Sequence, residues 1–192
     1  MCGIAGFVGK SPVADAAVSR TLELMRHRGP DDRTHRRFET PDGRWVELLH
    51  GRLNIIDLDS RANQPFQARD HWLAYNGELY NYVELRSELA RRGVAFSTTS
   101  DTEVLVELLA RDGWEALDRC EGMWGFALYD ARTGELGLCR DRFGEKPLYL
   151  LRDADGLYFG SEVKFIASLA GRRLEVNHRH LHRYLVNGYK SL

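Results

Sequence analysis

The first residues of the chain, Met1-Cys2-Gly3, place a thiol one residue from the N-terminus. A free thiol is only a few per cent ionised at neutral pH, so a nucleophilic cysteine needs a base beside it. If Met1 is removed, Cys2 itself supplies that base, because a free α-amine has a pKa of about 7.7–8.0. The alternative is that Cys2 is a small buried residue at the start of a strand, and position 2 by itself favours this alternative.

The stretch "AYNGELYN" contains two groups that could stabilise negative charge on an oxygen. The side-chain amide of Asn76 and the backbone N–H of Gly77 can point together at one oxygen atom, as in an oxyanion hole. Gly77 has no side chain to block the approach of a substrate. Because Asn-Gly is also the commonest short turn signal, an ordinary turn is the competing interpretation.

Arg52 and Asp101 could recognise the charged ends of a free amino acid. Arginine binds a carboxylate through two parallel hydrogen bonds, and an aspartate can pair with an ammonium group. Both residues also have ordinary interpretations. Arg52 could be a surface arginine, and Asp101 could be a carboxylate in the first turn of a helix.

The histidines allow a second mechanism, in which His50 or His27 forms a dyad with Cys2. We rank this dyad behind the α-amine base. The three histidines near the C-terminus are spaced two residues apart, whereas metal-binding pairs on a helix are spaced three or four apart. We therefore expect no metal site. The seven histidines are His27, His35, His50, His71, His178, His180 and His182.

The composition is that of a globular domain, with 192 residues, 43% hydrophobic and 29% charged. A net charge of −1 gives no reason to expect nucleic acid or an acidic membrane surface as a partner. No segment is long and apolar enough to span a membrane. The three cysteines have no metal-binding spacing, and an odd number favours a reducing compartment, so we expect a cytoplasmic protein.

The apolar periodicity predicts helices between two groups of strands. Two helices should begin at caps, with Asn81 and Glu84 in one capping box and Ser100 and Glu103 in the other. The last four strands look antiparallel, so an α+β layered fold is favoured over a doubly wound parallel one. The expected strands are 2–8, 34–38, 45–50, 72–76, 123–130, 135–141, 147–153 and 157–162, and the expected helices are 13–27, 81–93, 100–113, 162–170 and 178–186.

Taken in order, the motifs "MCGIAG", "RHRGPDD", "HGRLNIIDL", "YNGELYNY", "SDTE" and "EGMWGFALYD" resemble one family. It is the class II glutamine amidotransferase domain, whose nucleophile is the N-terminal residue. "HRGPD" followed by "GRLNIIDL" is similar to the branch found at the front of asparagine synthetases, and "RDRFGEKPLY" and "SEVK" agree with it.

The resemblance implies hydrolysis of L-glutamine to L-glutamate and ammonia through a γ-glutamyl thioester on Cys2, without a metal. It assigns the oxyanion hole to Asn76 and Gly77, and it pairs Arg52 with the glutamine α-carboxylate. Two alternatives stay open, an N-terminal-nucleophile amidase acting on another amide and a non-catalytic docking module. The remaining implied contacts to glutamine are the main chain near Ile55 and Ile56, the main chain around Glu78, and Asp101 for the α-amine.

The resemblance also implies a four-layer α-β-β-α sandwich of two antiparallel sheets, the N-terminal nucleophile hydrolase fold. It covers residues 1–170, so 171–192 is expected to be an extension that leads toward a synthetase domain. Such a domain or a separate partner would receive the ammonia, and only there would ATP and Mg²⁺ be needed. A homodimer is left open. The glycines of the first strand, Gly3, Gly6 and Gly9, would let it lie in a crowded sheet centre.

Overall fold

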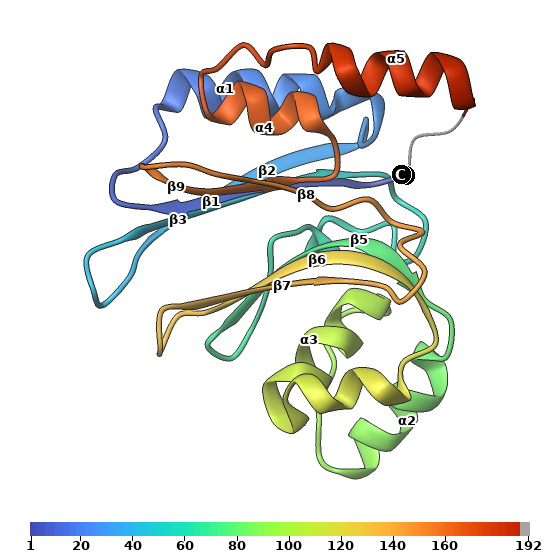
Figure 1. Ribbon diagram of the computed structural model, residues 1–192. Coiled ribbons are helices and arrows are strands. Elements are labelled where there is room, and N and C mark those ends of the chain that lie inside the picture. Colours follow the sequence, from blue (N-terminus) through green and yellow to red (C-terminus); the bar gives the residue numbers. More distant parts are fainter. Residues whose placement is uncertain (189–192) are drawn as a thin grey trace.

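Two antiparallel sheets pack face to face in the computed structural model, which describes residues 1–188 (Figure 1). Helices α1 and α4 cover the outer face of one sheet, and α2 and α3 cover the outer face of the other. The four layers therefore follow the order α-β-β-α. This arrangement confirms the predicted α+β sandwich.

The first sheet has five strands in the order β2-β3-β1-β9-β8. All of its neighbouring strands are antiparallel. Its strands are β1 (Gly3–Gly9), β2 (Asp32–Glu39), β3 (Trp45–Arg52), β8 (Tyr149–Arg152) and β9 (Gly156–Gly160).

The second sheet has four strands in the order β4-β5-β6-β7, and it is also antiparallel throughout. The four predicted strands after residue 122 are thus divided, because β6 and β7 belong to this sheet whereas β8 and β9 belong to the other. The strands are β4 (Phe66–Ala68), β5 (His71–Leu79), β6 (Gly122–Asp130) and β7 (Glu135–Arg140).

The helices lie close to their predicted positions. Three short 3-10 turns add to them: η1 (Met25–His27), η2 (Ser60–Ala62) and η3 (Trp114–Arg119). The α-helices are α1 (Asp15–Leu24), α2 (Tyr82–Arg91), α3 (Asp101–Asp112), α4 (Val163–Leu169) and α5 (His178–Asn187).

The predicted caps of α2 and α3 are only partly correct. The Ser100 side chain accepts the N–H of Thr102 and caps α3 as expected. The Asn81 side chain makes no cap to α2, because it bonds instead to the segment before β6. Glu103 does not complete a capping box either, since its carboxylate accepts the N–H groups of residues 97 and 98.

Strand β1 lies inside the five-stranded sheet, between β3 and β9. Two of its glycines are required by close packing. A Cβ at Gly6 would lie 2.2 Å from the Phe159 ring, and one at Gly9 would lie 2.2 Å from the carbonyl oxygen of Asp155. At Gly3 the nearest atom would be 3.3 Å away, so the crowding there is milder.

Strand alternation divides the side chains between the outer cores and the layer between the sheets. Ile4 of β1, Leu48 of β3, Ala74 of β5 and Ala127 of β6 all belong to the buried cluster between the sheets. On each of these strands, a residue that lies two or four positions from the named one also points its side chain into this inner layer.

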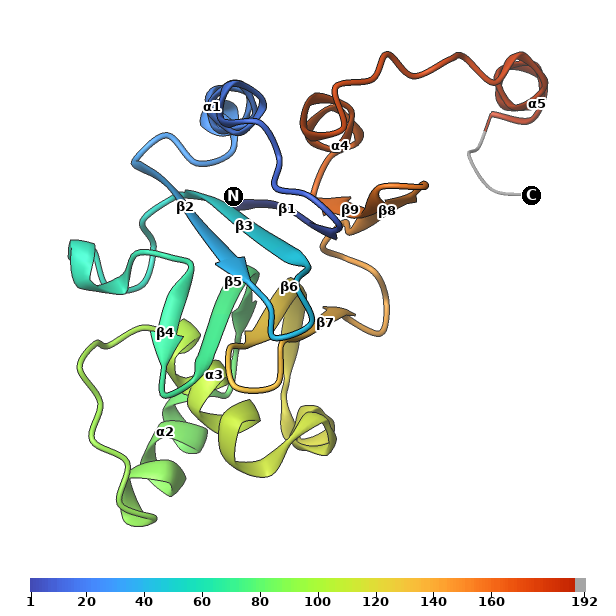
Figure 2. The same ribbon diagram turned by 90° about the vertical axis from the view of Figure 1, so that its left-hand side faces the viewer.

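Helix α5 lies beyond α4, at the end of an extended segment (Figure 2). No residue of α5 is buried. It falls within the predicted extension 171–192, of which residues 189–192 lie outside the described part of the chain, and the boundary at residue 170 remains a prediction. Within residues 1–188 no helix is long and apolar enough to cross a membrane.

Candidate active site

Cys2 lies one residue before β1, at the end of the sheet where β3 finishes. Gly3 pairs with Gly51, so the next position along each strand brings Cys2 beside Arg52. The N–H of Leu53 approaches the Cys2 thiol at 3.4 Å. Cys2 has the same strand parity as Ile4, which points its side chain toward the inner layer. Because Met1 is present, the nitrogen of Cys2 is here a peptide nitrogen.

The surroundings of Cys2 do not ionise its thiol unaided. Burial raises the pKa of this thiol, and the Leu53 N–H and the charge of Arg52 lower it to a smaller extent. A thiol with a raised pKa contains even less thiolate at neutral pH than a free one. Cys2 therefore needs a base if it is to act as a nucleophile.

The main chain of Cys2 is held by Arg28, which follows η1. Its Nε donates to the carbonyl oxygen of Cys2 at 2.8 Å, and its guanidinium pairs with Glu162 at 3.2 Å. The Ser161 hydroxyl accepts the N–H of Ile4 at 3.0 Å. The start of β1 is thus fixed by Arg28, 26 positions away, and by the distant Ser161, while Glu162 holds Arg28.

Arg52 is 4% exposed and its guanidinium is anchored by the loop that follows β3. One of its terminal nitrogens donates to the carbonyl of Asp59 at 2.9 Å and to the side chain of Asn63 at 2.6 Å. The other donates to the carbonyl of Asp57. Arginine has five N–H donors, so two remain for a ligand. The ordinary surface interpretation of Arg52 is excluded by its burial.

Asp101 lies in the first turn of α3 and is 5% exposed. Its Oδ2 accepts the hydroxyl of Tyr75 at 3.1 Å and the N–H of Leu79 at 3.0 Å. Burial raises the pKa of this carboxyl despite these bonds, and the negative charge of Glu78 adds to the rise. A ligand ammonium group at this position would supply the missing positive charge.

Asn76 and Gly77 lie within β5 and do not form a turn. Gly77 pairs with Trp124 of β6, and a Cβ at Gly77 would lie 2.4 Å from the carbonyl oxygen of Met123. No larger residue fits without moving the backbone. The turn interpretation of this Asn-Gly pair is therefore wrong, because both residues belong to one continuous strand.

The N–H of Gly77 points away from β6. The N–H groups of Tyr75 and Leu79 donate to Gln64 and Asp101, outside the β5–β6 ladder. In antiparallel pairs, residues two apart along a strand have the same orientation, so the N–H of Gly77 lies on the same open edge. No side chain or loop carbonyl within residues 1–188 accepts it.

The Gly77 N–H lies at the open edge of β5, whereas the Asn76 side chain points into the layer between the two sheets. It shares the parity of Ala74, which belongs to that layer, and it is 1% exposed. Its Nδ2 is buried and has no hydrogen-bond partner among the residues that the structure describes. An unpaired buried donor is costly, so this amide is ready to bind an acceptor.

One narrow cavity collects almost all the predicted site residues. Asn76 is the exception, because it lies beside the cavity wall and does not line it. The cavity also reveals lining residues that the sequence did not suggest: Leu53, Ala62, Gln64, Tyr75, Ser100 and Thr102. The predicted residues that line it are Cys2, Arg52, Ile55, Ile56, Gly77, Glu78 and Asp101.

Gln64 is the clearest of the unpredicted residues. It is 5% exposed, its Oε1 accepts the N–H of Tyr75 at 2.7 Å, and its Nε2 donates to Thr102 at 3.2 Å. It thereby joins the open edge of β5 to the start of α3. Nothing in the local sequence marks a glutamine in a polar loop as buried, so this role depends on tertiary contacts.

Neither candidate histidine contacts Cys2. His50 is fully buried, its Nε2 lies 3.1 Å from the carbonyl oxygen of Tyr75, and burial lowers its pKa to about 3. His27 binds Glu162 at 2.8 Å instead. The structure therefore gives no support to a Cys–His dyad. Within the described residues no group of three or more His, Cys, Asp or Glu side chains could hold a metal ion.

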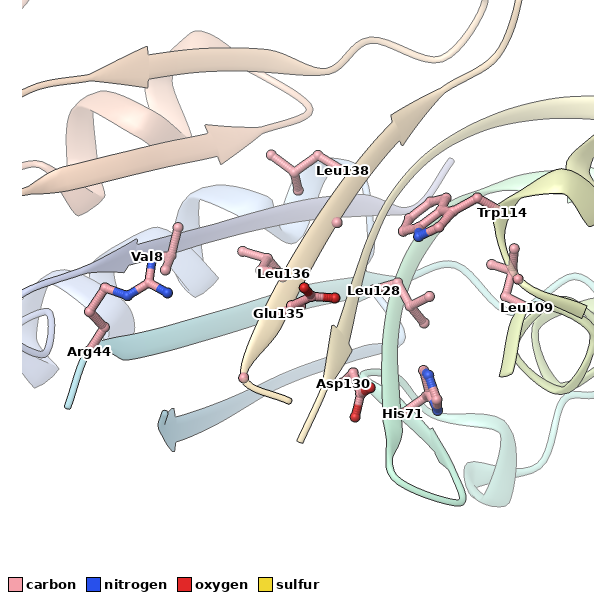
Figure 3. A pocket seen from close by; sticks show the side chains of 13 residues that line it. Val8, Arg44, His71, Leu109, Trp114, Leu128, Asp130, Glu135, Leu136 and Leu138 are labelled. Carbon is pink, nitrogen blue, oxygen red and sulfur yellow. The ribbon is translucent and has the colours of Figure 1, made fainter. Parts of the chain in front are cut away.

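A larger cavity lies elsewhere, around the edge strand β7 (Figure 3). It has a volume of about 660 Å³ and reaches the ends of β1 and β3 that are remote from Cys2. Trp114 and Leu109 border one side, while Asp130 and His71 lie near each other at another. None of the predicted site residues lines it.

Comparison with known proteins identifies relatives of the whole chain. The sequence model of a family described as "Glutamine amidotransferase domain" matches residues 1–192. Asparagine synthetase B of Escherichia coli is 40% identical over 85% of the chain, and asparagine synthetase 1 of Bacillus subtilis is 36% identical over 96%. Both are named glutamine-hydrolysing. The chain spans 29% of the length of each of these relatives.

A solved structure shows the same fold at low sequence identity. The glutamine phosphoribosylpyrophosphate amidotransferase of Bacillus subtilis superimposes with a TM-score of 0.71 over 88% of this chain and 44% of its own, at 20% identity. A structure described as the allosteric regulatory enzyme of purine biosynthesis gives a TM-score of 0.68 at 19% identity. The two-sheet sandwich is thus shared beyond the closely similar sequences.

Proposed function

Because the chain belongs to the glutamine amidotransferase domain family, and to its asparagine synthetase type, we propose that Cys2 hydrolyses L-glutamine once Met1 has been removed. The observation that carries the proposal is the convergence of Cys2, Arg52, Gly77 and Asp101 on one cavity. These residues come from the chain start before β1 and from β3, β5 and α3, and together they match the two charged ends and the amide of glutamine.

The substrate is oriented by its charged ends. Its α-carboxylate takes the two free N–H donors of Arg52, whose other donors already bind the loop after β3. Its α-ammonium lies against Asp101 and the main chain around Glu78. The main chain near Ile55 and Ile56 closes the pocket. This two-point recognition favours a free amino acid over a simple amide or an acylated one.

The first half of the reaction transfers the glutamyl group to sulfur. The α-amine of mature Cys2 accepts the thiol proton, and the thiolate attacks the side-chain amide carbon of glutamine. The carbonyl oxygen becomes an oxyanion, which accepts hydrogen bonds from Asn76 Nδ2 and the Gly77 N–H. The carbon–nitrogen bond then breaks, and the protonated α-amine returns its proton to the departing ammonia.

The second half releases glutamate. A water molecule gives a proton to the α-amine and attacks the thioester carbon, and the same oxyanion donors stabilise the new intermediate. The carbon–sulfur bond breaks, the thiol regains its proton and L-glutamate leaves. The hydrolysis needs neither a metal nor a cofactor.

The ammonia needs an acceptor, which the curated relatives suggest. Their names describe asparagine synthetases, and this chain matches only about a third of their length. We propose that a synthetase domain, in a longer chain or in a separate subunit, uses the ammonia with ATP and Mg²⁺. The three cysteines are all free, which suits a cytoplasmic location. A homodimer remains a prediction.

Glutamate release from L-glutamine tests the proposal directly. We expect the purified chain, with removal of Met1 confirmed by intact mass, to release glutamate. Cys2→Ala should lower the rate by at least about 10⁴-fold. Cys139→Ala is the matched control, because this cysteine lies on β7 and outside the cavity.

Equal rates for Cys2→Ala and the parent chain would refute the assignment of the nucleophile. Faster hydrolysis of a simple amide or of an acylated amino acid than of glutamine would favour the alternative amidase. Binding of a synthetase partner without glutamate release, with Met1 absent, would favour a docking module.

A further inference from the structure

Lys146, in the loop between β7 and β8, is a buried cation next to the N-terminus. It is 6% exposed. Its ammonium lies 3.3 Å from the thioether sulfur of Met1. A thioether is a weak acceptor, and lysine is almost never fully buried unless it is paired. Within residues 1–188 its ammonium has no carboxylate partner.

The loop around Lys146 is tightly held, so the position of its side chain is set by the fold. Asp141 accepts the backbone N–H of Lys146 at 2.9 Å together with three other main-chain N–H groups. The carbonyl oxygen of Lys146 accepts Nε of Arg140 at 2.9 Å. The Asp141 carboxylate thus organises the loop but leaves the Lys146 ammonium free.

The Lys146 side chain also lies over the part of the second sheet that carries Asn76. A Cβ built on Gly125 would be 3.7 Å from Cβ of Lys146, and Gly125 pairs directly with Asn76. Gly125 and Asn76 both face the inner layer. The lysine therefore extends through this layer from the Asn76 side toward the N-terminus.

Removal of Met1 changes the partners of Lys146. The thioether is lost, and the α-amine of Cys2 becomes the new chain end. This amine lies only a few covalent bonds from the position that the thioether occupied. The ammonium is then left about one methionine side chain away from a second titratable nitrogen. Two positive charges that share a partly buried site repel each other.

The other charged groups around the N-terminus already have partners or face the substrate. Arg28 is paired with Glu162 through Nη1, while its Nη2 has no partner among the described residues. Arg52 is bonded to neutral oxygens of the loop after β3, so its positive charge also acts on Cys2, and Asp101 accepts bonds from Tyr75 and Leu79. The charged groups with a contact or an electrostatic effect at the start of the chain are Arg28, Glu162, Arg52, Asp101 and Lys146.

We propose that Lys146 is a positioning residue of the mature site, whose ammonium disfavours protonation of the Cys2 α-amine and so keeps this base neutral. The inference rests on the proposed function, because it assumes that Met1 is removed and that the α-amine is the base. It adds a second positive charge, besides that of Arg52, that prepares this base. The thiol proton can then be accepted at a lower pH than an ordinary amine would allow.

The pH dependence of glutamine hydrolysis tests this role. The acidic limb of kcat/KM reports the α-amine of the free enzyme. Lys146→Met should move this limb upward by about one pH unit, which lowers kcat/KM about tenfold at pH 6 and little at pH 9. Lys146→Arg should restore the limb, and Lys10→Met, at the exposed far end of β1, should leave it unchanged.

A purely structural lysine would lower the rate equally at all pH values, so an unmoved limb in Lys146→Met would overturn the proposal. A second measurement does not need activity. The α-amine of chains that carry Cys2→Ala can be ¹³C-methylated and titrated by NMR, with and without Lys146→Met. We expect a lower amine pKa when Lys146 is present, and equal values would also overturn the proposal.

The two measurements separate the inference from the proposed function. If the parent chain released no glutamate, the proposed function would fail while the amine titration still tested Lys146. If Lys146→Met did not fold, titration of the parent chain would decide. An amine pKa at or above the ordinary range of about 7.7–8.0 would then contradict the proposal.

Discussion

The two ends of the sandwich each hold a cavity, and the two cavities differ in size and in chemistry. The cavity around β7 has a volume of about 660 Å³, within the range of small-molecule sites, whereas the cavity at Cys2 has about 50 Å³. In the large cavity Arg44 is half exposed and paired with Asp42, and Asp130 accepts nearby main-chain N–H groups. Most polar side chains of this cavity thus have partners. His71 differs, because its Nδ1 has no partner among the described residues.

The small cavity has the opposite character. Arg52 is buried with donors to spare, the Asn76 amide is buried beside the cavity without a partner, and the Gly77 N–H lies on an open strand edge. Buried polar groups without a partner destabilise the folded chain, and a ligand that forms hydrogen bonds with them removes this cost. The comparison teaches that the end for which we propose the reaction differs from the other by its unsatisfied polar groups and not by a large volume.

The sharpest test of this difference is Asn76→Ala. Loss of one oxyanion donor costs about 10²–10³ in kcat, because the amide binds the developing oxyanion and not the uncharged ground state. We expect kcat for glutamine hydrolysis to fall by this factor while KM changes little. Steady-state kinetics measure both, with Asn81→Ala as a control near the end of the same strand. An unchanged kcat would remove Asn76 from the oxyanion hole.

Arg52→Lys should have a smaller effect of a different kind. The substitution keeps the positive charge but loses the planar pair of donors, so we expect KM for glutamine to rise about tenfold with a lesser change in kcat. Arg61→Lys, on the same loop but half exposed, is the control. If both substitutions raised KM equally, Arg52 would act through the loop alone.

The smallest effect on turnover is expected at the large cavity. Trp114 borders it and stacks on Phe126, with ring centroids 5.9 Å apart. Trp114→Ala should lower the free energy of unfolding by about 1 kcal/mol and leave kcat/KM within about twofold. Urea unfolding and glutamine kinetics check the two parts. A large loss of turnover would erase the distinction between the two ends.

Much of the fold could be predicted because the helices and most strands have clear apolar periodicity. Strand β4 (Phe66–Ala68) could not, since its three residues are too few to show alternation. The division of the last four strands between two sheets was also beyond local patterns. Strand β9 pairs with its sequence neighbour β8 on one side and with β1, more than 140 residues away, on the other, and only tertiary packing selects β1.

The site was predictable where residue type itself restricts the chemistry. Cys2 and the Asn76-Gly77 pair each have an ordinary interpretation, and they suggest roles only in combination with Arg52 and Asp101. Gln64 and Lys146 carry no such signal, because both residue types are common in exposed loops. Gln64 is 5% exposed and Lys146 is 6% exposed. Their burial depends on elements far away in the sequence, and it is this burial that draws attention to them.

The position of β1 inside its sheet has a consequence for the newly made chain. Cys2 is the first part of the site to leave the ribosome, yet its strand lacks one neighbour until β9 (Gly156–Gly160) has been translated. The bonds from Ser161 to Ile4 and from Glu162 through Arg28 to Cys2 arrive only afterwards. A ribosome-bound or prematurely terminated product that ends before β9 therefore carries the thiol without the contacts from Ser161 and Glu162 that complete its support.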